Sequence, residues 1–196
     1  TGSAGKTFSG PQSGIILWDN PEFTEGITNT IFPALAATHQ VNRVAALAVA
    51  AAEFIEFGEE YMGQIIKNAK ALAKGLHERG IGVLGDHKGY TETHQVIANV
   101  GDFGGGYEVA NRLAEANIIV NKNLIPTDRP EDWDKPSGLR IGTIEATRLG
   151  MKEKDMDYVA ELISNIITQE EKPSNIKKKV LELRIEFNKL HYCFEE

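Results

Sequence analysis

The chain has 196 residues, 41% hydrophobic and 25% charged, and its formal net charge at pH 7 is -7. These values are typical of a globular protein with one large or two small domains. The lysines are spread along the chain and no apolar run is long enough to cross a bilayer, so we expect neither a nucleic-acid nor a membrane role.

The cellular compartment of the protein and its lack of a metal site are predicted from its cysteine and histidine content and from its N-terminal sequence. Cys193 is the only cysteine, so an internal disulfide is impossible. No charged segment followed by an apolar core opens the chain, and we expect a cytoplasmic protein. Thr1 begins inside what looks like a functional loop, which predicts further sequence upstream. No metal site is expected, because these histidines lack ligand spacing with Cys193 or with carboxylates: His39, His77, His87 and His94.

The N-terminal part predicts one strand and one long helix. Residues 14–19 form an apolar run between Gly-Pro and Asn-Pro, which indicates a buried strand. Residues 38–79 contain no proline and are rich in Ala, Leu, Glu and Lys, which favours a helix throughout. Gly80 then supplies a C-cap.

The remainder alternates strands and helices. Residues 121–137 are irregular and rich in Asn, Asp and Pro, as is typical of a long surface or site-lining loop. The expected strands cover residues 81–84, 93–100, 118–120 and 139–143. The expected helices cover residues 107–116, an apolar stripe from 156 to 167, and a second stripe from 176 to 190. We place a domain boundary near Ile81, with residues 1–80 ending in a connecting helix and residues 81–196 forming a compact α+β domain.

The segment around Lys6 admits two chemistries. Gly5-Lys6-Thr7 fits the end of a phosphate-binding P-loop, but that motif needs an earlier glycine and a helix that begins at the Lys-Thr pair. Gly10-Pro11 follows too closely for such a helix. The alternative is a lysine that joins an aldehyde cofactor, where small neighbours allow close approach. On residue chemistry alone, an ordinary surface lysine remains open.

Four motifs in order resolve this choice. They are Lys6 to Gly14 (KTFSGPQSG), Ile31-Phe32-Pro33 before an alanine-rich stretch, Val120 to Pro126 (VNKNLIP), and Ser137 to Thr143 (SGLRIGT). Together they resemble the C-terminal half of the serine hydroxymethyltransferase family. Thr147 to Met151 and the terminal His191-Tyr192-Cys193 are similar to archaeal members.

The resemblance implies an α/β fold, namely the C-terminal portion of a fold-type I pyridoxal-phosphate transferase. It implies that Lys6 forms the Schiff base with pyridoxal 5'-phosphate, with Ser3 and Thr38 near the cofactor. Arg140 would clamp the amino-acid carboxylate, and Asn123 would contact the pterin co-substrate, tetrahydrofolate or tetrahydromethanopterin. A homodimer, or association with the upstream half, would complete the site.

Some of these residues also have plainer interpretations. Arg140 fits a surface ion pair and Asn123 a turn residue. His94 either lines the site or caps a strand, and we favour the cap. The carboxylates of one cluster are typical of a solvated helix face: Glu56, Glu59 and Glu60.

The chain departs from the family pattern near the lysine. The usual His before the lysine is Gly5, a common Arg is Gln12, and the glycines after Phe-Pro are Ala36, Ala37 and Thr38. The residues that hold the cofactor ring lie upstream of the lysine in the family.

Three functions follow from these observations. The first is interconversion of serine and glycine with one-carbon transfer to a reduced pterin. The second is a pterin-independent, threonine-type aldolase acting on β-hydroxy amino acids. The third is a non-catalytic remnant that serves assembly.

Overall fold

A computed structural model describes residues 1–195 of the chain. The chain divides into two compact units, residues 1–59 with 193–195 and residues 60–192. Helix α2 (Val41–Glu78) contributes its first part to one unit and its last part to the other. The domain boundary expected near Ile81 stays a prediction.

The first unit consists of short elements followed by the start of α2. Strands β1 and β2 pair antiparallel, with Gly2 opposite Ile15 and Ser3 opposite Gly14. The elements that precede α2 are β1 (Gly2–Ser3), β2 (Gly14–Ile15), η1 (Pro21–Phe23), α1 (Thr24–Asn29) and η2 (Thr30–Leu35).

The buried strand expected over residues 14–19 is wrong in extent and in burial. Only Gly14 and Ile15 are paired, and the side chain of Leu17 is 84% exposed. An apolar run is buried only when neighbours cover it, and β1 supplies a partner for two residues alone. The long helix expected over residues 38–79 is confirmed as α2.

The second unit is a four-stranded antiparallel sheet with helices, so the mixed α/β class is confirmed. The strand order is β3-β4-β6-β5. The strands are β3 (Gly82–Val83), β4 (Gln95–Asn99), β5 (Asn121–Asn123) and β6 (Gly138–Gly142). The helices after α2 are η3 (Asp86–Lys88), η4 (Gly101–Phe103), α3 (Gly105–Glu115), η5 (Pro130–Asp132), α4 (Ile144–Arg148), α5 (Glu153–Ile167) and α6 (Pro173–Glu186).

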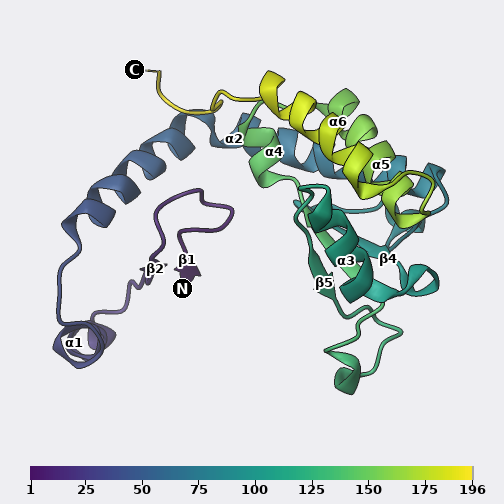
Figure 1. The fold of residues 1–196 in the computed structure, drawn as a ribbon. Coiled ribbons are helices and arrows are strands. Elements are labelled where there is room, and N and C mark those ends of the chain that lie inside the picture. The colour runs from purple at the N-terminus through teal and green to yellow at the C-terminus, as the bar shows by residue number, and fades with distance from the viewer. Residues whose placement is uncertain (196) are drawn as a thin grey trace. The chain divides into compact units, whose positions relative to one another are not determined.

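One face of this sheet forms the core. Along β4 and β6 the buried residues alternate with more exposed ones, so one face carries the apolar side chains. Helices α3, α5 and α6 contact one another and pack there with the last turns of α2 (Figure 1). The fully buried residues at the centre of the cluster are Leu72, Leu76, Leu113, Leu139, Ile163 and Ile167.

Polar side chains join α2 to the segment around α4. Asn68 is fully buried, and its amide donates to Thr147 Oγ1 and to the Met151 carbonyl, each at 2.8 Å. The Tyr192 ring stacks on Tyr61 with centroids 4.9 Å apart, while its hydroxyl accepts from Lys152 Nζ at 2.9 Å. The two bonds from Asn68 satisfy an amide that would otherwise be buried without partners.

Two further predictions are corrected. The strand expected over residues 118–120 lies instead at 121–123, because the Ile118 amide still bonds to the Leu113 carbonyl and closes α3. The last apolar stripe ends early. Helix α6 stops at Glu186, and Leu190 is 64% exposed.

The first turn of α3 approaches β6 so closely that only glycine fits. A Cβ at Gly106 would lie 2.2 Å from the Gly138 carbonyl oxygen. We predict that Gly106→Ala lowers the free energy of unfolding by at least about 1–3 kcal/mol, because the backbone must shift to relieve the clash. Gly63→Ala is the control, since nothing lies within 4 Å of a Cβ there. Urea denaturation of both variants measures the difference, and equal stabilities would contradict the prediction.

Candidate functional site

Lys6 lies in a closed loop between β1 and β2. The Ala4 amide donates to the Ser13 carbonyl and the Gly10 amide to the Ala4 carbonyl, both at 2.9 Å. The Ser9 amide donates to the Lys6 carbonyl at 2.9 Å. Ala4 is fully buried whereas the Lys6 side chain is exposed. The Lys6 amine is therefore accessible, while hydrogen bonds within the loop hold its main chain in place.

The first turns of α2 support this loop. The Phe8 ring stacks on Phe54 with centroids 4.9 Å apart. Arg43 Nη1 donates to the Gln12 carbonyl at 2.9 Å. Residues 7–13, all of them described, contain turns and no helix, so the helix that a P-loop requires after Lys6 is missing.

The surroundings of Lys6 suit a bulky aldehyde cofactor. The residue before it, Gly5, has no side chain and is exposed. Small residues leave the main chain open to close approach, and the exposed amine is available to a carbonyl carbon. Ser3, in β1, is exposed on the same loop. The residues present here therefore fit pyridoxal phosphate at Lys6.

Thr38 lines a cavity of about 360 Å³ in the same unit. Ser13 of the lysine loop and Arg43 of α2 line it as well. Thr38 is thus placed on one cavity wall with a residue of the lysine loop.

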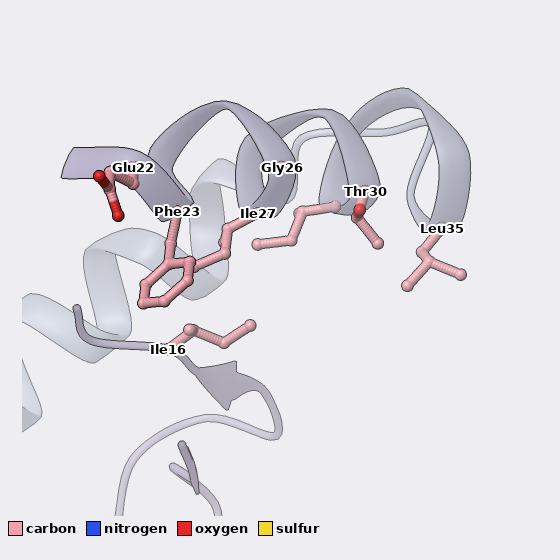
Figure 2. A pocket seen from close by; sticks show the side chains of 8 residues that line it. Ile16, Glu22, Phe23, Gly26, Ile27, Thr30 and Leu35 are labelled. Carbon is pink, nitrogen blue, oxygen red and sulfur yellow. The ribbon is translucent and has the colours of Figure 1, made fainter. Parts of the chain in front are cut away.

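A larger cavity of about 490 Å³ lies between α1, η2 and Ile16. Figure 2 shows Phe23 at the end of η1 and Ile27 of α1, with Ile16 facing them. Its lining is apolar apart from Glu22 and Thr30, so this surface offers packing and no reactive cluster.

Arg140 and Asn123 lie on one face of the second unit's sheet. Arg140 pairs with Asn121 of β5 and with Ile97 of β4. Because residues two apart in a strand point to the same face, Asn123 shares the face of Asn121 and Arg140. This is the face opposite the core, and Arg140 is exposed on it. The sequence motifs placed these two residues in separate segments, and the sheet brings them together.

His94 directly precedes β4, and the charge of Arg140 contributes to its pKa. Its imidazole is half-buried, and Nε2 lies 3.2 Å from Gln95 Nε2. Burial and the positive charge of Arg140 together lower the pKa of His94 below its ordinary value of 6.5. The imidazole therefore lies within electrostatic reach of the guanidinium.

Asp128 holds the loop that follows β5. Its Oδ2 accepts from the Ile125 amide at 3.0 Å and from the Ser137 amide at 2.9 Å. Burial opposes ionisation, but the hydrogen bonds from Ser137 and Ile125 outweigh it and lower the pKa of Asp128. Asn123, just before this loop, donates from Nδ2 to the Leu124 carbonyl. The carboxylate thus fixes the segment next to a predicted site residue.

Comparison with known proteins settles the family. The family model described as serine hydroxymethyltransferase matches residues 1–163. The chain belongs to the serine hydroxymethyltransferase family. The expected family resemblance is confirmed, and so is its archaeal character, because the curated relatives below are archaeal.

Relatives named serine hydroxymethyltransferase match over this whole chain. The proteins of Saccharolobus islandicus and Methanocaldococcus jannaschii are each 47% identical over 100% of this chain, which covers 45% and 46% of their lengths. The chain thus spans about half the length of the curated relatives it matches. A crystal structure of L-threonine transaldolase from Pseudomonas fluorescens matches with a TM-score of 0.85 and 32% identity, over 98% of this chain and 44% of that one. The expected transferase fold is confirmed by these matches.

The described part of the chain shows two further features. Within residues 1–195, no helix has both the length and the apolar character needed to span a bilayer. In the same residues, no three His, Cys, Asp or Glu side chains are grouped as the ligands of a metal ion would be.

The sequence did not indicate the residues that hold the site loops through tertiary hydrogen bonds. Arg43 lay inside a helix without a motif, and only its bond to the Gln12 carbonyl marks it. Asp128 looked like one acid among several in a loop. The alternation of β4 could have placed Asn99 and Gln95 on the face of Arg140, had the strand order been known.

The Arg140 charge can be measured at His94. We predict that Arg140→Met raises the pKa of His94 towards 6.5, since the variant removes a positive charge that disfavours the imidazolium. Burial remains, so the value stays below 6.5. NMR titration of the ring protons measures the His94 pKa, with Arg184→Met as a charge-matched control. An unchanged pKa would show that burial acts alone.

The lowered pKa of His94 also predicts a pH dependence of stability. The free energy of unfolding should rise with pH up to 6.5, because the unfolded state binds a proton at His94 that the folded state does not.

The role of Asp128 is testable by hydrogen exchange. In Asp128→Asn we expect the amides of Ile125 and Ser137 to exchange about tenfold faster, because a charged acceptor is replaced by a neutral one. Lowering the pH through the folded pKa of Asp128, which lies below 3.8, should have the same effect in the parent chain. Asp102→Asn, on an acid for which no such pair of bonds is seen, is the control. Unaltered exchange at both amides would refute the role.

Proposed function

We propose that this chain forms part of a pyridoxal-phosphate enzyme that interconverts serine and glycine and transfers the one-carbon unit to a reduced pterin. The observation that carries the proposal is the exposed Lys6 amine in a closed loop of small residues, in a chain of the serine hydroxymethyltransferase family. Because the chain spans about half of its relatives, this function is proposed for the whole protein.

Lys6 would hold the cofactor covalently, and Ser3 and Thr38 would supply hydroxyl groups near it. When bound, pyridoxal phosphate supplies an electron sink for the substrate's α-carbon. The loop contributes orientation, because its amides are bonded to Ser13 and Ala4 and its Phe8 ring is stacked on α2.

Arg140 would bind the substrate carboxylate. Its guanidinium is exposed, and within residues 1–195 no carboxylate forms an ion pair with it. The structure therefore gives no support to the plainer interpretation as a surface ion pair. A planar guanidinium donates two parallel hydrogen bonds to a carboxylate, which fixes the amino acid in orientation as well as position.

Asn123 would contact the pterin, tetrahydrofolate or tetrahydromethanopterin. It shares the sheet face of Arg140, and its amide is already ordered by the Leu124 carbonyl. A homodimer or association with an upstream half, and a cytoplasmic location, belong to the same proposal.

A second candidate keeps the cofactor and omits the pterin. The structural match to an L-threonine transaldolase favours a reaction on a β-hydroxy amino acid. Threonine cleavage without pterin would identify this reaction, whereas pterin-dependent turnover of serine identifies the first.

The Lys6 assignment predicts a single labelled lysine. After incubation with pyridoxal phosphate and reduction with borohydride, we expect peptide mass spectrometry to find the pyridoxyl group on Lys6. The reason is that Lys6 combines an exposed amine with small neighbours. Lys6→Ala should abolish labelling, while Lys154→Ala, at an exposed position on α5, should not.

Two outcomes would count against the proposal. Labelling spread evenly over many lysines would show that Lys6 is an ordinary surface lysine. No labelling in the full-length protein, together with no serine or threonine turnover, would favour a non-catalytic remnant.

A further inference from the structure

The chain continues past α6 as a tail that returns to α2. Residues 187–195 contain no helix or strand. The Tyr192 ring stacks on Tyr61 with centroids 4.9 Å apart, and the Phe194 ring meets Phe57 edge to face with centroids 5.6 Å apart. Phe57 and Tyr61 are four positions apart in α2 and share one face of that helix. The tail therefore follows this face of α2 through two aromatic contacts.

Hydrogen bonds fix Tyr192 at its main chain and at its hydroxyl. Its carbonyl accepts from Arg148 Nη1 at 2.6 Å, and the neighbouring His191 amide donates to the Arg148 carbonyl at 2.8 Å. Its hydroxyl accepts from Lys152 Nζ at 2.9 Å. Tyr192 has a φ of 57°, a left-handed conformation that a bulky residue adopts only where its surroundings hold it. The bonds to Arg148 and Lys152 hold it there.

Gly150, in the turn between α4 and α5, leaves room for the tail. A Cβ at this position would lie 2.6 Å from His191 Nε2, so any side chain would displace the imidazole. Next to this turn, Lys152 Nζ lies 3.4 Å from Gln64 Oε1, and Gln64 donates to the fully buried Asn68 at 2.9 Å. The tail therefore lies over polar groups that continue into the buried bonds between α2 and α4.

We propose that residues 191–194 form a latch that docks reversibly in a groove between α2 and the α4–α5 turn, with Tyr192 as its anchor. A segment at a chain end, without secondary structure and held mainly by one side chain, opens at a much smaller cost than the whole fold. The tail sequence ends in two glutamates and the groove carries Arg148 and Lys152, so their attraction favours the closed state. Opening uncovers Lys152 and Gln64 and releases the turn after α4.

Cys193 provides the measurement of opening. It is the only cysteine in the chain and lies partly buried beside the anchor, so its thiol reacts freely only when the latch is open. Its rate of reaction with 5,5'-dithiobis(2-nitrobenzoic acid) in the intact chain is divided by the rate for a synthetic peptide of the same tail sequence. We expect Tyr192→Ala to raise this ratio about 10-fold to 100-fold, since it removes the ring stack and the Lys152 bond. Tyr192→Phe should raise it less, because the stack remains.

Variants of the groove should act on the same thiol. Lys152→Met should raise the ratio as Tyr192→Phe does, because it removes the partner of the tyrosine hydroxyl. Lys154→Met, at an exposed position of α5, should leave the ratio unchanged. Lys6→Ala should also leave it unchanged, since the latch involves neither Lys6 nor a cofactor and stands apart from the proposed function.

Two results would overturn the latch. The first is an unchanged ratio in Tyr192→Ala when that variant retains its circular-dichroism spectrum. The second is a labelling rate of the parent chain that rises with urea as steeply as global unfolding does, because Cys193 would then react only from the unfolded chain. A rate that stays level at low urea and rises only within the unfolding transition supports local opening of the latch.

Discussion

Strands β4 and β6 pair over five residues, from Gln95 opposite Gly142 to Asn99 opposite Gly138, and this register decides which side chains face the core. A shift by one residue would turn Arg140 into the core and expose its neighbours. The register is held at one end by Gly138, whose position would place a Cβ 2.4 Å from Ile125 Cγ2. Core packing and the polar face thus depend on the same backbone pairing.

The lysine loop depends on a different support. Its own hydrogen bonds close it, but its position on α2 comes from the ring contact between Phe8 and Phe54 and from the Arg43 bond to Gln12. Both contacts join segments more than 30 positions apart in sequence. These two contacts fix the position of the loop on the first turns of α2. The exposed amine of Lys6 therefore lies on a loop whose position depends on contacts with α2.

How far the sequence predicts this molecule depends on whether a feature is local or tertiary. Helix α2 was predictable because composition and the absence of proline act locally. Lys6 and Arg140 were predictable because motifs carry them. The exposure of residues 14–19 was not predictable, since an apolar run is buried only by a covering partner, and β1 supplies one for only two residues. Nor was the effect of the Arg140 charge on the pKa of His94 predictable, because it requires the strand order.

The departures from the family pattern are connected in space. A side chain at Gly5 would press against Gln12, which sits at 3.3 Å from the Cβ position. The carbonyl of Gln12 orients Arg43, and Arg43 shares a cavity with Thr38. The departures at Gly5, Gln12 and Thr38 are separate in sequence. In the structure Gly5 packs against Gln12, and Gln12 is linked to Thr38 through Arg43.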